Sequence, residues 1–371
     1  MKLPSWYRPE SDRFIHLDVL RFIASSAVIV FHYKGLIDWS SALKSVPDHM
    51  SALRMAVDLF FVISGVVMYD LYAGKLGNWR AFGVFMRRRL ARLAPLHYAT
   101  FAFFALMGVA ATRLGAPIGH PEAFDPACII PNLTFIHSFN LCKGLTYNQP
   151  SWSISAEMGM YLLLPLFLWA VQWRRAAWAF LILFLTALFA GQAMGFERWT
   201  VWTYDFGVVR AVPSFLLGLL LAGSRRQLDR IPTPSMLMGL AFVAFAFEMV
   251  FSASDLVCVL TLYAIAALGV AADHKRNASR AMRLIAPLGR LTYSIYMLHG
   301  PIAIVVVTIV GKRLLHLEGI ALNALVVLLA VVILPTAALV SYVFFETPLR
   351  LWLSGRTPLK VGDVATVQHQ I

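Results

Sequence analysis

The sequence predicts an all-α membrane protein, a polytopic bundle of about ten transmembrane helices. Hydrophobic residues make up 59% of the 371 residues, and the mean hydropathy is +0.70. Charged residues make up only 14%, whereas a soluble domain carries roughly 25%. A soluble fold of this length cannot bury so much apolar surface. Composition therefore excludes the disordered, fibrous, disulfide-scaffold and ordinary cytosolic classes.

The expected spans follow from runs of apolar residues. A membrane-crossing helix needs about 20 mostly apolar residues. The first run contains Arg21 and His32 and is not followed by a small-residue cleavage site, which favours a retained helix over a signal peptide. In chain order, the ten expected spans are Leu17–Ile37, Ala52–Tyr72, Pro95–Leu114, Trp152–Gln172, Ala176–Gly195, Phe206–Gly223, Pro234–Phe251, Asp255–Ala272, Ile285–Val310 and Ile320–Phe345.

The distribution of Lys and Arg predicts the orientation. A net charge of +13 raises nucleic acid as a partner, but membrane proteins also gather Lys and Arg in their cytoplasmic loops. Counted over alternate loops, 21 of the 32 Lys and Arg residues lie on one side and 7 on the other. We therefore expect a multi-pass protein of the inner (cytoplasmic) membrane with both termini cytoplasmic and no nucleic-acid partner. The expected organisation is an N-terminal tail (1–16), a transmembrane domain (17–346) and a C-terminal tail (347–371).

The three cysteines do not form a framework. Cys258 lies in an apolar run, where a buried free thiol is expected. Cys128 and Cys142 share the longest loop, Gly115–Ser151, which the orientation places outside. A disulfide there is compatible with an oxidising compartment, and the sequence leaves its formation open. The chain has no Cys-x-x-Cys or His-x-x-x-His spacing, so no metal site is expected.

Ionisable residues inside spans are costly and mark functional candidates. Arg21 and His32 are 11 residues apart in the first span, which places them on one helix face, about 16.5 Å apart along the axis. A cation at the cytoplasmic entrance and an imidazole beyond the midplane fit a long anionic cofactor that enters from the cytoplasm. A snorkelling Arg and a helix-packing His explain the same pattern equally well.

Two carboxylates are expected near the depth of His32. Asp58 shares a face of the second span with Arg54, and Glu157 lies near the outer end of the fourth. A buried His beside a carboxylate is the usual equipment of a general base and its orienter. A structural ion pair would look the same in sequence. In the second span, Ser64-Gly65 predicts close helix packing.

The segment before the third span, expected as a cytoplasmic loop, holds four Arg within six residues, Arg87 to Arg92. The Arg guanidinium recognises phosphate through bidentate hydrogen bonds, so this segment is a candidate phosphate-binding site. The residues alone favour a topology signal or an anionic-lipid contact instead. In the ninth span, Arg290 and His299 are nine residues apart and point to opposite faces. We interpret His299 as structural.

Taken together, these motifs resemble the acyltransferase-3 family of integral-membrane acyltransferases, which modify sugars of surface and exported polysaccharides. The chain resembles the stand-alone form, without the periplasmic hydrolase-like domain that larger members append. In order, the motifs are Leu17-Asp18-x-Leu-Arg21 with His32, Phe60–Gly65, Arg89-x-x-Arg92-x-x-Pro95, Asn132–Phe135, Trp152-Ser153-x-x-x-Glu157, Leu288-Gly289 through Tyr293 with Tyr296 and His299, and Glu346-x-Pro348.

The resemblance implies a ten-helix bundle that moves an acyl group, by default acetyl, from cytoplasmic acyl-coenzyme A to a polysaccharide hydroxyl or its lipid-linked precursor. Arg21, Arg89 and Arg92 would then bind the coenzyme phosphates. His32 would act as general base or as an acylated nucleophile, oriented by Glu157 or Asp58. Expected partners are the glycan or lipid-linked acceptor, acyl-coenzyme A, membrane lipids and polysaccharide-assembly proteins.

Two other classes remain open on the sequence. A transporter or flippase of lipid-linked saccharides would also need ten spans and buried charges, although the halves of the chain show no obvious repeat. A sensor or scaffold with a degenerate site is the other, and the presence of His32, Glu157 and the Arg segment argues against it.

Overall fold

The computed structural model describes residues 14–40, 43–115, 120–276 and 278–355, and within them every regular element is a helix. The first half contains α1 (Ile15–Tyr33), α2 (Val46–His49), η3 (Met50–Met55), α3 (Ala56–Tyr72), α4 (Trp79–Arg113), η4 (Pro121–Phe124), η5 (Pro126–Cys128), α5 (Ile129–Leu133), η6 (Gln149–Ser151), α6 (Trp152–Leu162), α7 (Leu164–Ala170) and α8 (Arg174–Ala193). The second half contains η7 (Trp199–Val201), α9 (Gly207–Gly223), α10 (Arg225–Leu228), α11 (Pro234–Val250), α12 (Asp255–His274), α13 (Arg280–Ile285), η8 (Ala286–Arg290), α14 (Thr292–Ala303), η9 (Ile304–Leu314), α15 (Gly319–Leu328), η10 (Leu329–Ile333), α16 (Leu334–Ser341), η11 (Tyr342–Glu346) and α17 (Thr347–Leu353).

The helices that could cross a membrane coincide with the expected spans. Seven of the described helices are long and apolar enough to span, and the bent pair Gln149–Leu162 and Leu164–Ala170 is an eighth candidate. Two shorter apolar helices, α9 and α11, occupy the remaining expected positions. A multi-span, all-helical protein is thus confirmed, while the count of ten and the cytoplasmic termini stay predictions. The seven helices long and apolar enough to span are Ile15–Tyr33, Val46–Tyr72, Trp79–Arg113, Arg174–Ala193, Asp255–His274, Thr292–Leu314 and Gly319–Leu353.

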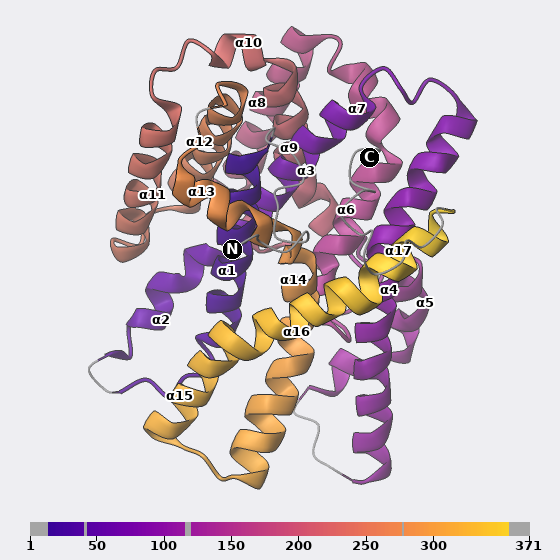
Figure 1. Cartoon of the computed structure of the whole chain (residues 1–371), viewed down its shortest axis with the longest axis vertical. Coiled ribbons are helices and arrows are strands. Elements are labelled where there is room, and N and C mark those ends of the chain that lie inside the picture. The colour runs from indigo at the N-terminus through magenta and orange to yellow at the C-terminus, as the bar shows by residue number, and fades with distance from the viewer. Residues whose placement is uncertain (1–13, 41–42, 116–119, 277, 356–371) are drawn as a thin grey trace.

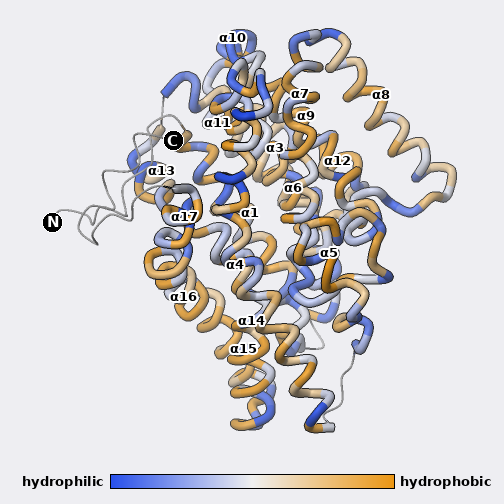
Figure 2. Tube along the Cα trace, turned by 90° about the vertical axis from the view of Figure 1, so that its right-hand side faces the viewer, coloured by the Kyte–Doolittle hydropathy of each residue, from blue (hydrophilic) through white to orange (hydrophobic). Residues whose placement is uncertain are grey.

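The helices form a central group with apolar helices around it. α1 packs against α3, α12 and α14, and Figure 1 shows it in the interior of the bundle. At the periphery, α8 buries only Ala177 and Leu181. Figure 2 shows α8 as hydrophobic along its length, with hydrophilic residues gathered at the end of the molecule near α10. An exposed, uniformly apolar helix is stable against lipid because all its backbone hydrogen bonds are internal.

α3 and α9 pack backbone to backbone through two glycines. A Cβ at Gly65 would lie 2.2 Å from the carbonyl oxygen of Phe215, and one at Gly218 would lie 2.0 Å from that of Val62. Only glycine permits this approach, because any side chain would overlap the facing main chain. The prediction of close packing at Ser64-Gly65 is confirmed, and the contact fixes α3 beside the residues that α9 contributes.

The Arg-rich segment expected as a cytoplasmic loop is instead the first part of α4. The helix begins after Asn78, whose side chain accepts a hydrogen bond from the backbone of Ala81, and continues through Pro95 to Arg113. Arg is a good helix former, but its charge lowers the hydropathy of the segment. The hydropathy pattern therefore did not predict that the helix includes it. The helix presents the Arg side chains of this segment on defined faces.

The fourth expected span is broken rather than straight. α6 and α7 meet at an angle of 58°, and Pro165 lies at the start of α7. Proline cannot donate the helical hydrogen bond and clashes with the preceding turn, so the bend occurs directly before it. The short α6 then carries Trp152, Ser153 and Glu157 on one rigid segment.

The loop that contains Cys128 and Cys142 is held by a disulfide. Cys128 and Cys142, 14 residues apart, are bonded, which answers the question that the sequence left open. The loop also contacts the middle of α14, where Asn148 Nδ2 donates to the carbonyl oxygen of Met297 at 3.1 Å. In the same loop, burial, helped by the neighbouring His97, lowers the pKa of His137 to about 3. His137 is therefore neutral at physiological pH.

Candidate active site

A cavity lies between α1, α3, α4, α6 and α14. It encloses about 790 Å³, including the solvent at its mouth. Four of the six predicted site residues line it, namely Arg21, Arg89, Arg92 and Glu157. The full lining is Arg21, Val57, Phe60, Phe61, Ser64, Val67, Met68, Arg89, Arg92, Leu93, Ser153, Ile154, Glu157, Tyr161, Thr292, Tyr293 and Tyr296.

Arg89 is a buried cation that forms no ion pair with the described carboxylates. Its side chain is only 7% exposed, and its single hydrogen bond among the described residues runs from Nη2 to Tyr72 Oη at 3.0 Å. Three aromatic rings lie 5.5–5.8 Å from the guanidinium, those of Tyr72, Phe85 and Tyr161. These contacts offset part of the desolvation cost, but none of the described carboxylates pairs with it. A buried charge in this state is costly, and an anionic ligand in the cavity would satisfy it.

Arg21 approaches the same cavity from α1. Its Nη1 donates to Asp18 Oδ1 at 3.0 Å, one helical turn earlier. The Leu17-Asp18-x-Leu-Arg21 motif therefore contains an i,i+3 ion pair that holds the guanidinium against the helix. Together with Arg89 and Arg92, it makes one end of the cavity strongly cationic.

Glu157 lies on the cavity wall rather than beside His32. Its Oε1 accepts hydrogen bonds from Ser64 Oγ at 2.7 Å and from Tyr161 Oη at 2.5 Å. The first bond joins α6 to α3, across the wall, and the second lies within α6. This arrangement places a carboxylate and two hydroxyl groups on the cavity wall.

Tyr296 and Phe60 close the opposite end. Their ring centroids are 6.1 Å apart. The Tyr296 hydroxyl donates to the carbonyl oxygen of Pro150 at 2.8 Å and contacts Ser153 Oγ at 2.7 Å. These bonds fix the Tyr296 ring between α14, η6 and α6, and the cavity ends there.

Beyond Tyr296 lie two histidines in contact. The ring centroids of His32 and His299 are 4.9 Å apart, and that of Tyr296 lies 6.0 Å from that of His299. His299 is 2% exposed, whereas His32 is exposed. His32 does not line the cavity, so Tyr296 separates the cationic chamber from the histidine pair.

The tautomer of His299 follows from its hydrogen bond. Nδ1 lies 2.6 Å from the carbonyl oxygen of Tyr296. A carbonyl oxygen can only accept, so Nδ1 carries the proton, and Nε2 of the neutral ring is an acceptor. We interpreted His299 as structural from its spacing to Arg290; its backbone bond agrees, but its contact with His32 also makes it part of the site. The sequence signal was the Tyr296-x-x-His299 spacing, which places both residues on one side of α14.

Asp58 is paired elsewhere. Arg210 donates from Nη2 to Asp58 Oδ2 at 2.8 Å and from Nε to Oδ1 at 3.3 Å, and both side chains are almost fully buried. Neither Asp58 nor Glu157 hydrogen-bonds to His32. The sequence places Asp58 and His32 at similar depths, but depth does not determine which residues pair. Both oxygens of Asp58 accept hydrogen bonds from Arg210, which is 152 residues away in the chain.

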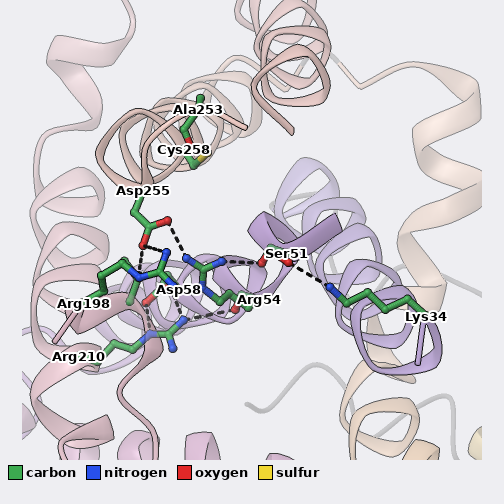
Figure 3. Close-up of polar contacts among 10 residues, drawn as sticks. Lys34, Ser51, Arg54, Asp58, Arg198, Arg210, Ala253, Asp255 and Cys258 are labelled. Atoms are coloured by element: carbon green, nitrogen blue, oxygen red, sulfur yellow. Dashed lines mark hydrogen bonds and ion pairs between the residues drawn. The ribbon is translucent and has the colours of Figure 1, made fainter. Parts of the chain in front are cut away.

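Arg54 also takes a separate partner. Its Nη2 donates to Asp255 Oδ1 at 2.6 Å, and Thr200 Oγ1 donates to Oδ2 of the same carboxylate at 2.5 Å. Figure 3 shows the Arg54–Asp255 and Arg210–Asp58 pairs side by side, with Ser51 linking Arg54 to Lys34. Arg54 and Asp58, expected on one face of the second span, thus belong to two neighbouring ion pairs that join η3, α3, α9 and α12.

Comparison with known proteins places this site in context. The family model described as "Acyltransferase domain" matches residues 14–346. Acyltransferase MdmB of Streptomyces mycarofaciens is 30% identical over 165 residues, 43% of this chain and 40% of that protein. Protein 2 in picA locus of Rhizobium radiobacter is 28% identical over 158 residues, 40% of this chain and 78% of that protein. The chain thus spans less than half the length of the first relative. No solved structure matches.

Proposed function

The chain belongs to the acyltransferase-3 family, and on this premise we propose that it moves an acyl group from cytoplasmic acyl-coenzyme A to a sugar hydroxyl. As a member of this family it is an O-acyltransferase embedded in a membrane by its apolar helices. The proposed acceptor is a surface or exported polysaccharide, or its lipid-linked precursor, at the inner (cytoplasmic) membrane. The proposed acyl group is acetyl.

The observation that carries this proposal is the buried guanidinium of Arg89. It faces a cavity of about 790 Å³ that Arg21 and Arg92 also line, and the described residues supply it with no carboxylate. Coenzyme A carries a pyrophosphate, and Arg binds phosphate oxygens bidentately. The cationic end of the cavity therefore suits the nucleotide end of the donor.

The middle and far end of the cavity suit the rest of that donor. The pantetheine arm is uncharged and carries two amides, which can hydrogen-bond to the hydroxyls and carboxylate of Ser64, Glu157 and Tyr161. Phe60 and Phe61 supply apolar contacts toward the closed end. A donor that enters at Arg89 would thus direct its thioester toward Tyr296 and the histidine pair. We assign Glu157 to positioning of the arm, since it does not contact His32.

His32 is proposed to act where the two substrates meet. As general base, its imidazole takes the proton of the acceptor hydroxyl while the hydroxyl oxygen bonds to the thioester carbonyl carbon. The carbon–sulfur bond then breaks, and the proton passes from His32 to the departing thiolate. In the covalent variant, a ring nitrogen of His32 first takes the acyl group and the hydroxyl then displaces it. The exposure of His32 gives an acceptor access.

His299 supports His32 in this scheme. Its Nδ1–H is bound to the Tyr296 carbonyl, so the ring next to His32 is held in one orientation. A neutral neighbour leaves room for His32 to accept a proton, whereas a charged one would oppose it. The same backbone bond couples the position of His299 to Tyr296, which closes the donor cavity.

The experiment measures donor binding and transfer separately, with the full chain purified in detergent. We expect H32A to bind acetyl-coenzyme A normally but to release free thiol at least about 100-fold more slowly when glycan extracted from a strain lacking the protein is added. We expect R89A to weaken coenzyme A binding by about 10-fold or more. R226A is the matched control, because Arg226 is exposed on α10, and it should change neither quantity.

Near-normal transfer by H32A would exclude both versions of the His32 mechanism. If R89A binds coenzyme A with unchanged affinity, the Arg segment serves only to set the membrane topology. Because Arg89 is buried, R89K serves as a second variant that keeps the charge, and the thermal unfolding of each variant shows whether it is folded.

A further inference from the structure

A second, smaller pocket opens beside the cationic end of the donor cavity. It lies between α4, η8, α14, η11 and α17 and has a volume of about 310 Å³, including the solvent at its mouth. Arg92 and Tyr293 line both spaces, so the small pocket is a side chamber of the cavity. The placement of acyl-coenzyme A proposed above puts no part of the donor in this pocket. Its remaining polar lining comes from Arg290, Glu346, Thr347 and Arg350.

The side chamber carries an excess of positive charge. Three guanidinium groups line it, from Arg92, Arg290 and Arg350, against the one carboxylate of Glu346. Glu346 Oε1 accepts hydrogen bonds from Ser294 Oγ at 2.6 Å and Ser341 Oγ at 2.8 Å, so neutral hydroxyls hold it in place. None of the described carboxylates forms an ion pair with Arg350. The lining is thus suited to an anion.

Thr347 supplies an independent sign of a ligand. It is 6% exposed, yet among the described residues its Oγ1 has no hydrogen-bond partner. Buried hydroxyls are normally paired, and one left without a partner calls for an explanation. Thr347 lines the side chamber, and a hydroxyl beside guanidinium groups is a usual donor to phosphate oxygens.

We propose that this side chamber binds a phosphate monoester, and that the phosphate is the one on the ribose of coenzyme A. The assignment of the source rests on the proposed function. Coenzyme A carries two separate phosphate units, a pyrophosphate and a ribose 3′-phosphate. Two adjoining cationic spaces that share Arg92 match this division: the pyrophosphate lies near Arg21 and Arg89, and the monoester lies near Arg350 and Thr347. A phosphate monoester carries up to two negative charges at neutral pH, and a guanidinium such as that of Arg350 binds its oxygens through charge-assisted hydrogen bonds.

The test compares coenzyme A with 3′-dephospho-coenzyme A, which lacks only the monoester. Binding of both to the purified full chain is measured by calorimetry in detergent. The wild-type chain should bind coenzyme A about 10-fold more tightly than the dephospho form. R350A should lose this preference by weakening coenzyme A alone. T347V, which keeps the side-chain shape, should reduce the preference by about 3-fold. R226A should keep it in full.

Each alternative has its own result. Equal binding of the two ligands by the wild-type chain, or equal weakening of both in R350A and T347V, would overturn the inference while leaving the proposed function intact. Binding of neither ligand by the wild-type chain would instead contradict the proposed function. An anionic lipid headgroup offers the same chemistry. If phosphatidylglycerol in nanodiscs raises the melting temperature of the wild-type chain but not of R350A, and the ligand preference is unchanged in R350A, the coenzyme assignment is wrong.

Discussion

Some buried ionisable residues in this protein form an ion pair within the bundle, and others have no carboxylate partner among the described residues. Asp58 and Arg210 satisfy each other inside the bundle. Removal of one partner from such a pair costs several kcal/mol, because the other charge is left buried and uncompensated. Arg89 is equally buried but has no carboxylate partner among the described residues. Loss of activity in an Asp58 variant would therefore report on folding, whereas loss of binding in an Arg89 variant reports on the ligand.

The role of His299 can be separated into its two nitrogens. H299N keeps an amide N–H near the position of Nδ1, which bonds to the Tyr296 carbonyl, but lacks Nε2. H299Q places an amide near Nε2 and loses the backbone bond. If Nε2 beside His32 supports the reaction, we expect H299N to lower kcat by about 10-fold to 100-fold with little change in KM for the donor, and H299Q to keep more activity. Steady-state kinetics on the purified variants checks this.

A purely structural His299 gives the opposite order. H299N would then resemble the wild-type chain, and H299Q would have a lower melting temperature and lower activity. Recovery of H299N activity by added imidazole would support the first reading further, since a small cavity remains where Nε2 was.

At the scale of the elements, the site depends on how closely α3 approaches α9. α3 carries Asp58, Phe60 and Ser64, and α9 carries Arg210. The two helices meet at Gly65 and Gly218, where a methyl group on either side would overlap the facing backbone. The aromatic end of the donor cavity and the buried ion pair are therefore both set by this one contact.

We expect G65A and G218A to destabilise the protein by about 1–3 kcal/mol each, because the helices must move apart to fit the methyl group. The measurement is thermal unfolding in detergent, together with coenzyme A binding, which should weaken as the cavity changes shape. G83A is the matched control, since a Cβ at Gly83 of α4 meets nothing within 4 Å and Ala is the better helix former. A melting temperature lowered equally in all three variants would contradict this account.

The elements also show what hydropathy conceals. The sequence predicted one straight span at Trp152–Gln172, yet Pro165 breaks it into α6 and α7. It predicted a loop over the Arg segment that is the first part of α4. Charge lowers hydropathy without lowering helix propensity, so a window that detects membrane spans locates lipid contact rather than the ends of helices.

At the scale of the whole molecule, the orientation decides which substrate meets which end of the site. The Lys and Arg bias predicts that α10 faces the cytoplasm and that the connection after α14 faces outward. R226C and K312C place an exposed thiol on each side. The natural cysteines give little background, because Cys128 and Cys142 are bonded to each other and Cys258 is buried.

We expect a membrane-impermeant maleimide to label K312C in intact spheroplasts, and R226C only after the membrane is opened. The chain without added cysteines is the control and should remain unlabelled. Labelling of R226C in intact spheroplasts would reverse the orientation. It would then place the cationic end of the cavity on the outer side, away from cytoplasmic acyl-coenzyme A.

The sequence by itself determined the class of the molecule, the position of its apolar helices, its family and three arginines that line the cavity. These follow from local properties, since hydropathy, charge bias and motif spacing are read along one segment at a time. Arg21 could be singled out because charges within apolar segments are rare, whereas Arg89 and Arg92 could be singled out through the Arg89-x-x-Arg92-x-x-Pro95 motif of the family.

Only the tertiary structure decided the partners. Asp58 and Arg210 are 152 residues apart, Glu157 and Ser64 are 93 apart, and His32 meets His299 from the other end of the chain. A helix wheel gives the face and depth of a residue but not the helix that packs against that face. That choice is made by contacts such as the one between Gly65 and Gly218, which bring distant segments to backbone distance and so fix whether a buried charge is neutralised by the protein or left for a ligand.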